Sequence, residues 1–361
     1  MTTAAKSYFR YHLRSQWKLL LCIVLIALML TVSSAATQKV ELSYTRDETL
    51  HTTVHYNCTL EISLAVLVVC SYVLPATEFS MFKKRRNLDC FYGLPISRRQ
   101  MGMVHYITGL ICLVVPYTCA YLANFLFLLR YPEGFDFAPL LSYYFLSLGL
   151  GVCAYSFNVF VFNRANSTGD GIWFMILCGF VVPVLIGICY GIYSLIQPIL
   201  LLDEGILEEY WRNSTGHMAS YVGALGYVNM VYGGTIEKSE HYTLMDLWGQ
   251  WSNAAWLLFL SAAGIASAVG FTRSFGRGRP EKVGEVSDSW FGFKLMIPIY
   301  AAYFSVTLGM RLFGLIAAFV GYLIYRKGFH LKRSDWIVLG ALALLNLLCQ
   351  IIGILTLLTL L

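Results

Sequence analysis

Long apolar stretches recur along the chain, and they constrain its fold more than any other feature. A helix needs about 20 mostly apolar residues to cross a bilayer. Six segments meet this requirement: 19–36, 60–78, 104–129, 138–161, 172–201 and 254–272. Two further apolar stretches follow, at 294–325 and 336–361. The sequence therefore predicts an all-α, polytopic helical membrane protein.

The composition argues against the other broad classes of protein. Charged residues make up 13% of the chain and hydrophobic residues 58%, whereas a soluble domain carries about 25% charged residues. Most of the 10 cysteines fall inside apolar runs and none forms a CxxC pair, so a disulfide scaffold is a poor fit. The net charge of +6 is informative because lysine and arginine are expected to concentrate on the cytoplasmic side of the membrane. We therefore expect no nucleic-acid partner.

The stretch 294–325 decides the number of spans. It contains Pro298, Gly309 and Arg311, and it is read either as one long tilted helix or as two short helices that turn near Gly309. The segments on both sides of it are basic, and lysine and arginine concentrate in cytoplasmic loops. Two helices keep both segments inside and give nine spans with a cytoplasmic N-terminus, and 20 of the 26 Lys and Arg residues then lie in cytoplasmic segments. A single helix gives the alternative of eight spans.

Residues 1–18 are expected to form an amphipathic helix along the inner leaflet, ahead of an uncleaved first span. Apolar and aromatic residues recur there at helical spacing together with one histidine: Ala5, Tyr8, Phe9, His12, Leu13 and Trp17. The membrane-interface residues would be Phe9, Arg10, Leu13, Arg14 and Trp17. The alternative is a basic flank that only orients the first span.

The loop between spans two and three is the most informative segment. Residues 79–92 are compatible with a helix and carry the basic run 83–86. Gly93 can end this helix, Pro95 prevents its continuation, and Ser97 with Gln100 forms a capping-box pattern that opens span three. We interpret the segment as a short helix across the cytoplasmic mouth that docks onto another protein. The alternative is a stop-transfer charge cluster with an interfacial helix.

The loop between spans five and six, residues 203–253, is predicted to be external. Its stretch 217–233 has few charges and is expected to form a short re-entrant or interfacial helix. A loop of this length serves either as a cap or gate or as a structural lid.

Sequence patterns for catalysis are absent. The chain has no GxxxxGK[ST] phosphate-binding loop, no HExxH and no GxSxG, so we expect no catalytic residue. His51 and His55 stand four residues apart without a third ligand, so we expect neither a metal site nor a cofactor in this chain. The few ionisable residues of the spans lie near their ends: Glu61 and Glu78 in span two, and His105 in span three. A proton- or ion-coupled transporter needs such groups near the midplane, so the energy source is expected outside this chain.

The segment from Glu78 to Gln100, with its basic run 83–86 and its Leu94-Pro95-Ile96-Ser97-Arg98 motif, resembles a loop of known transporters. It is similar to the loop before span three in permeases of bacterial ATP-binding-cassette (ABC) transporters of the type-2 exporter class. The basic N-terminal helix, the first six spans and the stretch Arg279–Gly284 fit that class too. The resemblance covers about residues 1–285, and the 290–361 extension departs from the plain six-span plan.

The resemblance implies a half-transporter in the bacterial plasma membrane. Two permease chains, identical or different, would pair, and each would dock a separate ABC ATPase subunit that binds ATP and magnesium. Residues 79–92 would be the coupling helix, and residues 3–17 the connecting helix. The residues expected to contact the ATPase are Phe82, Arg85, Leu88, Phe91, Tyr92, Leu94 and Pro95.

The expected organisation and function follow from these predictions. Residues 1–18 form the interfacial helix, 19–272 a six-span permease core, and 273–361 a cytoplasmic loop with a two- or three-span extension. The expected function is export of a peptide, an antibiotic or another amphipathic molecule. An intramembrane enzyme and a secondary transporter are the alternatives.

Overall fold

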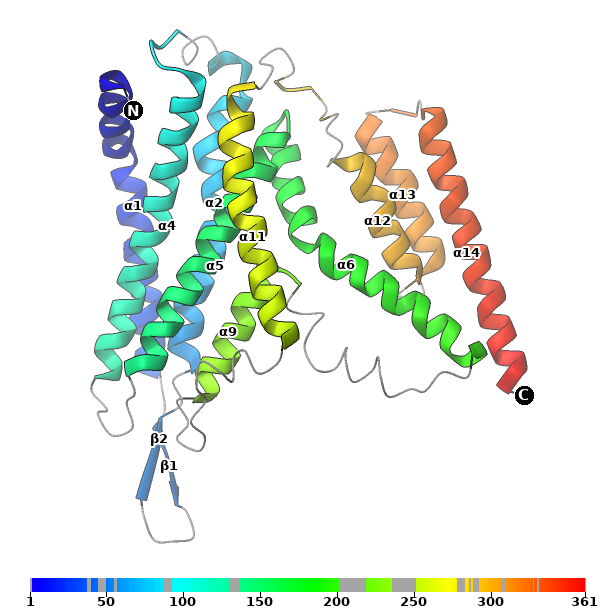
Figure 1. Cartoon of the computed structure of the whole chain (residues 1–361), viewed down its shortest axis with the longest axis horizontal. Coiled ribbons are helices and arrows are strands. Elements are labelled where there is room, and N and C mark those ends of the chain that lie inside the picture. The colour runs from blue at the N-terminus through cyan, green and yellow to red at the C-terminus, as the bar shows by residue number, and fades with distance from the viewer. Residues whose placement is uncertain are drawn as a thin grey trace. The chain divides into compact units, whose positions relative to one another are not determined.

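The computed structural model describes most of the chain. The described residues are 2–37, 40–44, 50–54, 57–87, 93–129, 137–200, 219–235, 251–277, 283–285, 287, 292–306, 310–326, 328–329 and 331–360. They divide into two compact units (Figure 1). Unit 1 is Met1–Asn163 with Tyr221–Glu281, and unit 2 is Arg164–Ser220 with Lys282–Leu361.

The described residues of unit 1 form helices and one β-hairpin. Its elements are α1 (Thr3–Thr37), β1 (Val40–Tyr44), β2 (Leu50–Val54), α2 (Asn57–Phe79), the 3-10 helix η1 (Ser80–Lys83), α4 (Arg98–Leu128), α5 (Phe137–Arg164), α9 (Tyr221–Thr235), α11 (Trp251–Ser274) and the 3-10 helix η2 (Phe275–Arg277). Helix α1 packs along α4, and α2 packs against both.

The β-hairpin between α1 and α2 was not predicted. β1 and β2 pair antiparallel with Val40 opposite Val54 and Tyr44 opposite Leu50. Both segments are rich in Val, Leu, Thr and Tyr, which favour extended backbone. The hairpin lies at the opposite end of unit 1 from η1 (Figure 1).

Polar groups inside unit 1 tie its helices together. The Tyr106 hydroxyl lies 2.7 Å from Ser156 Oγ, and the Tyr121 hydroxyl donates to the Leu140 carbonyl at 2.7 Å, so both join α4 to α5. Helix α9 lies within the predicted external loop, close to the expected helix 217–233. Its Tyr221 hydroxyl donates to the Leu260 carbonyl of α11 at 2.7 Å. Such bonds satisfy polar atoms that would otherwise be stranded in an apolar interior.

Glycine allows a close contact between helices α5 and α11 of unit 1. A Cβ placed on Gly264 of α11 would stand 2.4 Å from the Cβ and 2.7 Å from the Cα of Cys153 on α5. Since those are backbone-anchored atoms, only a residue without a side chain permits the observed approach.

Unit 2 contains α6 (Thr168–Leu200), α12 (Phe293–Val306), α13 (Arg311–Arg326) and α14 (Arg333–Leu360). α12 packs against both α6 and α13, and α14 packs against all three. The Tyr300 hydroxyl of α12 donates to the Leu177 carbonyl of α6 at 2.7 Å. Arg326 donates two bonds, of 2.8 and 2.9 Å, to Asp335, which also accepts from the Lys332 N–H at 3.0 Å at the start of α14.

The grouping of α6 differs from the expected domains. We expected the span at 172–201 to belong to a six-span core, 19–272, with residues 273–361 as an extension. Instead α6 clusters with the C-terminal helices. Its contacts with α12 account for this grouping, because Tyr300 bonds to it and the Tyr303 ring lies against Gly187.

The lengths and surfaces of the helices are those of a polytopic membrane protein. Among the described residues, seven helices are long and apolar enough to cross a bilayer: α1, α2, α4, α5, α6, α11 and α14. Large apolar side chains such as Met29, Phe145 and Ile324 are exposed along them and along α13, which suits contact with lipid and not with water. The stretch 294–325 forms two short apolar helices, α12 and α13, and not one long helix. The predicted turn at Gly309 lies outside the described residues. Membrane crossing by α12 and α13, and the nine-span topology, stay predictions.

Candidate functional site

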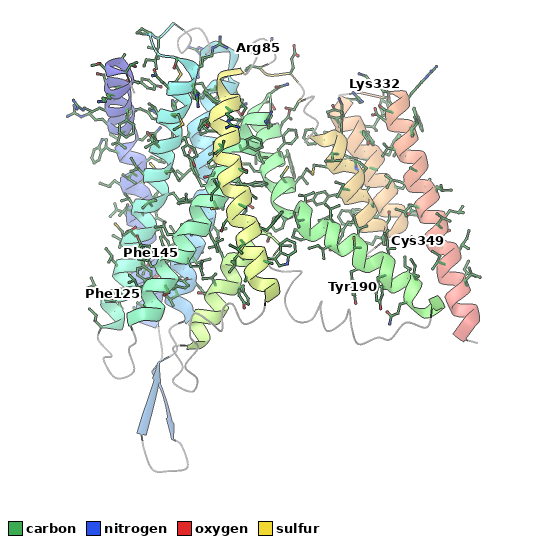
Figure 2. All side chains as sticks on the ribbon, in the orientation of Figure 1. Arg85, Phe125, Phe145, Tyr190, Lys332 and Cys349 are labelled. Carbon is green, nitrogen blue, oxygen red and sulfur yellow. The ribbon has the colours of Figure 1, made fainter. Side chains whose placement is uncertain are left out.

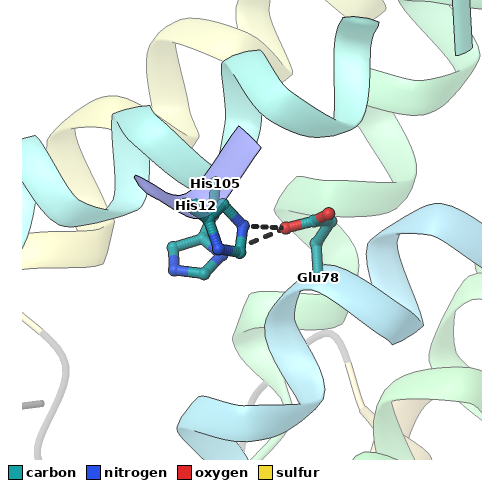
Figure 3. A group of neighbouring side chains, drawn as sticks. All are labelled: His12, Glu78 and His105. Carbon is teal, nitrogen blue, oxygen red and sulfur yellow. Dashed lines mark hydrogen bonds and ion pairs between the residues drawn. The ribbon is translucent and has the colours of Figure 1, made fainter. Parts of the chain in front are cut away.

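Three helices of unit 1 bring two histidines and a glutamate together. His12 lies in the first third of α1, Glu78 is the penultimate residue of α2, and His105 lies in the third turn of α4. Their exposed fractions are 5%, 0% and 0%. Figure 3 shows both imidazole rings directed at one end of the Glu78 carboxylate. We call these three residues the His-Glu-His cluster.

The geometry of the cluster centres on one carboxylate oxygen. His12 Nε2 lies 2.8 Å from Glu78 Oε2, and His105 Nδ1 lies 3.1 Å from the same atom (Figure 3). Because a carboxylate only accepts, both ring nitrogens donate to it. The Tyr8 hydroxyl meets the other nitrogen of His105, Nε2, at 3.0 Å. Tyr8 therefore holds the His105 ring with Nδ1 towards Glu78.

Aromatic rings enclose this polar centre. The Phe82 ring stands edge-on to His105 with ring centroids 4.9 Å apart, and the Phe79 centroid lies 6.1 Å from that of His105. The second carboxylate oxygen of Glu78, Oε1, is buried and has no hydrogen-bond partner among the described residues. An ionised carboxylate in such a place is costly unless a counter-charge lies beside it.

Two chemical roles suit this arrangement. One ligand atom from each of the three side chains lies within 4.8 Å of the others, so they can surround a metal ion. If one imidazole takes up a second proton, it becomes a cation and forms an ion pair with Glu78 that holds three helices together.

The predicted helix 79–92 is divided in the structure. Phe79 ends α2, residues 80–83 form η1, and residues 85–87 are helical. Leu88, Phe91 and Tyr92 lie outside the described residues. Arg85 is exposed near this end of unit 1 (Figure 2), Pro95 is exposed and Leu94 is half-buried.

Phe82 does not lie where an ATPase contact was expected. Its side chain is only 7% exposed and packs edge-on against both His105 and Phe275. Its neighbour Lys83 also turns inward, because its Nζ donates to the Asn163 carbonyl at 3.3 Å and stands 5.9 Å from the Phe162 ring centroid. Both residues anchor the segment to α4, α5 and η2. We therefore omit Phe82 from the proposed contact surface.

Exposed cations stand before and after residues 87–97 in the sequence. They are Lys84, Arg85, Arg86, Arg98 and Arg99, and we call them the basic lip. The start of α4 fixes its second half, since the Gln100 N–H donates to Ser97 Oγ at 3.3 Å as the capping pattern predicts. In a capping box the side chain of Gln100 would also accept a hydrogen bond from the backbone N–H of Ser97. Here Gln100 Oε1 accepts instead from the Thr2 hydroxyl at 3.3 Å.

The N-terminal residues differ from the expected interfacial helix in one respect. α1 runs unbroken from Thr3 to Thr37, so no boundary separates residues 1–18 from the first span. Arg10, Arg14 and Trp17 are exposed, in keeping with an interface role, and Phe9 and Leu13 are half-buried. The opposite face, with Ala5 and His12, is buried against the rest of unit 1.

We compared the chain with known protein families, curated proteins and solved structures. No family model, no curated protein and no solved structure matches this chain.

The sequence drew attention to each residue of the cluster separately, but it did not predict that the three side chains are in contact. Glu78 and His105 were noted only as ionisable residues near span ends, and His12 as part of a helical stripe. The feature of the sequence that could have predicted their contact is their similar expected depth in the membrane. All three lie at span ends assigned to the cytoplasmic side by the basic segments, and His12 and Tyr8 share one face of their helix.

Proposed function

We propose that this chain is the transmembrane permease subunit of an ABC transporter, driven by a separate ATPase subunit. It would export a peptide, an antibiotic or another amphipathic molecule across a bacterial plasma membrane. A second permease chain would complete the complex. The proposal builds on the polytopic helical fold, on the absence of a phosphate-binding loop from the sequence, and on the resemblance of residues 78–100.

The main support for the proposal is the way in which the basic lip is attached to unit 1. An element that passes motion from a soluble partner to membrane helices needs a rigid base and an outward polar surface. Phe82 and Lys83 supply the base, because both side chains are held inside unit 1. Lys84, Arg85 and Arg86 face outward directly after them. This alternation fits a coupling segment better than a plain stop-transfer cluster, which needs no inward anchor.

The partner surface implied by the lip is acidic. Five exposed cations lie close together in the sequence, three just before residue 87 and two just after residue 97. An acidic or carbonyl-rich groove on the ATPase would attract this surface and set its orientation. Each exposed charge pair contributes about 0.5–1 kcal/mol, so several pairs act together.

The test is recovery of the native complex from its own host. The full-length chain, carrying an affinity tag, is extracted from membranes in mild detergent, and co-purifying proteins are identified by mass spectrometry. We expect a protein with a GxxxxGK[ST] motif in amounts comparable to the chain. Absence of any such protein, or transport by the purified chain alone on an ion gradient, would refute the proposal.

Charge reversal locates the contact. In the variant Lys84→Glu/Arg86→Glu we expect ATPase binding to weaken about 5- to 30-fold, the equivalent of two lost surface pairs. The matched control Lys332→Glu/Arg333→Glu makes the same change in charge on exposed residues at the start of α14 in unit 2. We expect it to bind normally. Equal binding by both variants would exclude the basic lip as the contact.

A further inference from the structure

We propose that His12, Glu78 and His105 form a binding site for a divalent transition metal ion of the zinc type. The ion would join α1, α2 and α4 at the end of unit 1 that carries the basic lip. The inference rests on the geometry of the cluster and not on the proposed transport function.

The donor set and its spacing suit such an ion. Two imidazole nitrogens and one carboxylate oxygen are an established zinc ligand set, with the fourth position left to water. Metal–ligand bonds of about 2.0–2.1 Å in a tetrahedron place ligand atoms about 3.4 Å apart. The observed N–O separations are 2.8 and 3.1 Å, and all three donors lie within 4.8 Å. Side-chain shifts of about half an ångström would therefore make room for the ion without moving a helix.

The unused oxygen of Glu78 is an independent observation. Its Oε1 is fully buried, and no described residue hydrogen-bonds to it. Buried carboxylate oxygens normally have a partner, because leaving one unpaired costs free energy. An ion between the two imidazoles can be bound by either carboxylate oxygen or by both.

The surroundings of His105 also suit a ligand. Metal-bound histidines usually hydrogen-bond through their second ring nitrogen, which fixes the ring and the tautomer. Tyr8 provides this contact to His105 Nε2 at 3.0 Å and leaves Nδ1 facing the cluster. The rings of Phe79 and Phe82 restrict access of water to this side. The cluster thus has ligands, an orienting outer contact and an apolar wall.

The charge balance favours a cation over an empty cluster. With both imidazoles neutral, the buried Glu78 carboxylate has no described counter-charge within the cluster. A divalent ion supplies that charge and keeps both rings in the neutral form that binds metal. A second proton on one imidazole could supply the counter-charge instead, and the experiment below distinguishes the two.

The first experiment uses the full-length chain, purified in detergent with a tag that contains no histidine and stripped of metal by a chelator. Cobalt(II) is then added as a spectroscopic stand-in for zinc. We expect visible absorption bands of imidazole-ligated cobalt that saturate at one equivalent per chain and disappear when zinc displaces it. At zinc about 100-fold above its Kd, the unfolding temperature should rise by about 4 °C. A wild-type chain that binds neither ion above background overturns the proposal and leaves the proton as the counter-charge.

Variants assign the site. His12→Ala and His105→Ala should weaken binding by about 100-fold or more, since even outer contacts are worth 10- to 100-fold. Tyr8→Phe should weaken it about tenfold. Glu78→Gln keeps the side-chain shape and one acceptor oxygen but removes the charge, so it should fold and still lose affinity. Gel filtration reports the fold of each variant.

The matched control is His51→Ala/His55→Ala, which removes the two histidines that stand four residues apart in the sequence and lie outside the cluster. It should bind cobalt as the wild type does. Loss of binding in this control, with normal binding by His12→Ala and His105→Ala, would overturn the proposal. Because no ATPase is present in these measurements, their failure would not affect the transport proposal, and a missing ATPase would not affect the metal site.

Discussion

The contact between α5 and α11 predicts a large effect from one methyl group. In Gly264→Ala the new Cβ would lie 2.4 Å from Cys153 Cβ and 2.7 Å from its Cα. Carbon atoms in contact prefer about 3.5–4.0 Å, and a backbone atom cannot rotate away, so α11 must move outward by about 1 Å. Such overpacking costs about 1–3 kcal/mol. The better helix propensity of alanine returns up to about 1 kcal/mol.

We therefore expect Gly264→Ala to lower the stability of the protein by about 1–2 kcal/mol net. In thermal unfolding of the detergent-solubilised chain this corresponds to a loss of about 1–3 °C, because the unfolding entropy grows with chain length. The control is Gly149→Ala in α5, where no atom lies within 4 Å of the new Cβ and the residue is exposed. It should be neutral or slightly stabilising. Cys153→Gly should rescue Gly264→Ala only in part, because it removes the crowding Cβ and Sγ atoms but leaves the backbone in place. Equal unfolding temperatures for the two alanine variants would refute the tight contact.

Two further predictions concern helix ends. Arg326→Ala leaves the Asp335 carboxylate, 3% exposed, without its bidentate partner, and should destabilise the protein by about 3 kcal/mol. The double variant Arg326→Ala/Asp335→Ala should recover most of this loss in thermal unfolding, and no recovery would contradict the pairing. Ser97→Ala removes the cap that accepts from the Gln100 N–H and should cost about 1 kcal/mol. Ser97→Asp should retain stability, so equal losses in both Ser97 variants would exclude a capping role.

Local features of the fold could be predicted from the sequence. The apolar stretches identified the long helices, and the basic segments around 294–325 favoured two short helices, which the structure contains as α12 and α13. Ser97 and Gln100 located the start of α4 to the residue. The expected helix at 217–233 corresponds to α9 at 221–235. Hydrophobic length and capping act within one segment, so no tertiary information is needed for these features.

The remaining features depend on contacts between distant segments. His12 and Glu78 are 66 positions apart, and hydropathy does not reveal that their helices face one another. The grouping of α6 with the C-terminal helices depends in the same way on the bond from Tyr300 to Leu177. The amphipathic pattern of residues 3–18 was interpreted as facing lipid, whereas the buried positions Ala5 and His12 face protein. Apolar residues are favoured in both settings, so the pattern alone could not distinguish them.

The continuity of α1 has a mechanical consequence. Thirty-five residues in one helix span about 52 Å, well beyond the hydrocarbon thickness of about 30 Å. A straight rod of this length turns a small change of inclination into a large displacement. Pivoting by about 5° swings its far tip by about 4–5 Å. Any thinning of the bilayer around the C-terminal half of α1 would therefore displace the first three turns of this helix against the residues that they contact.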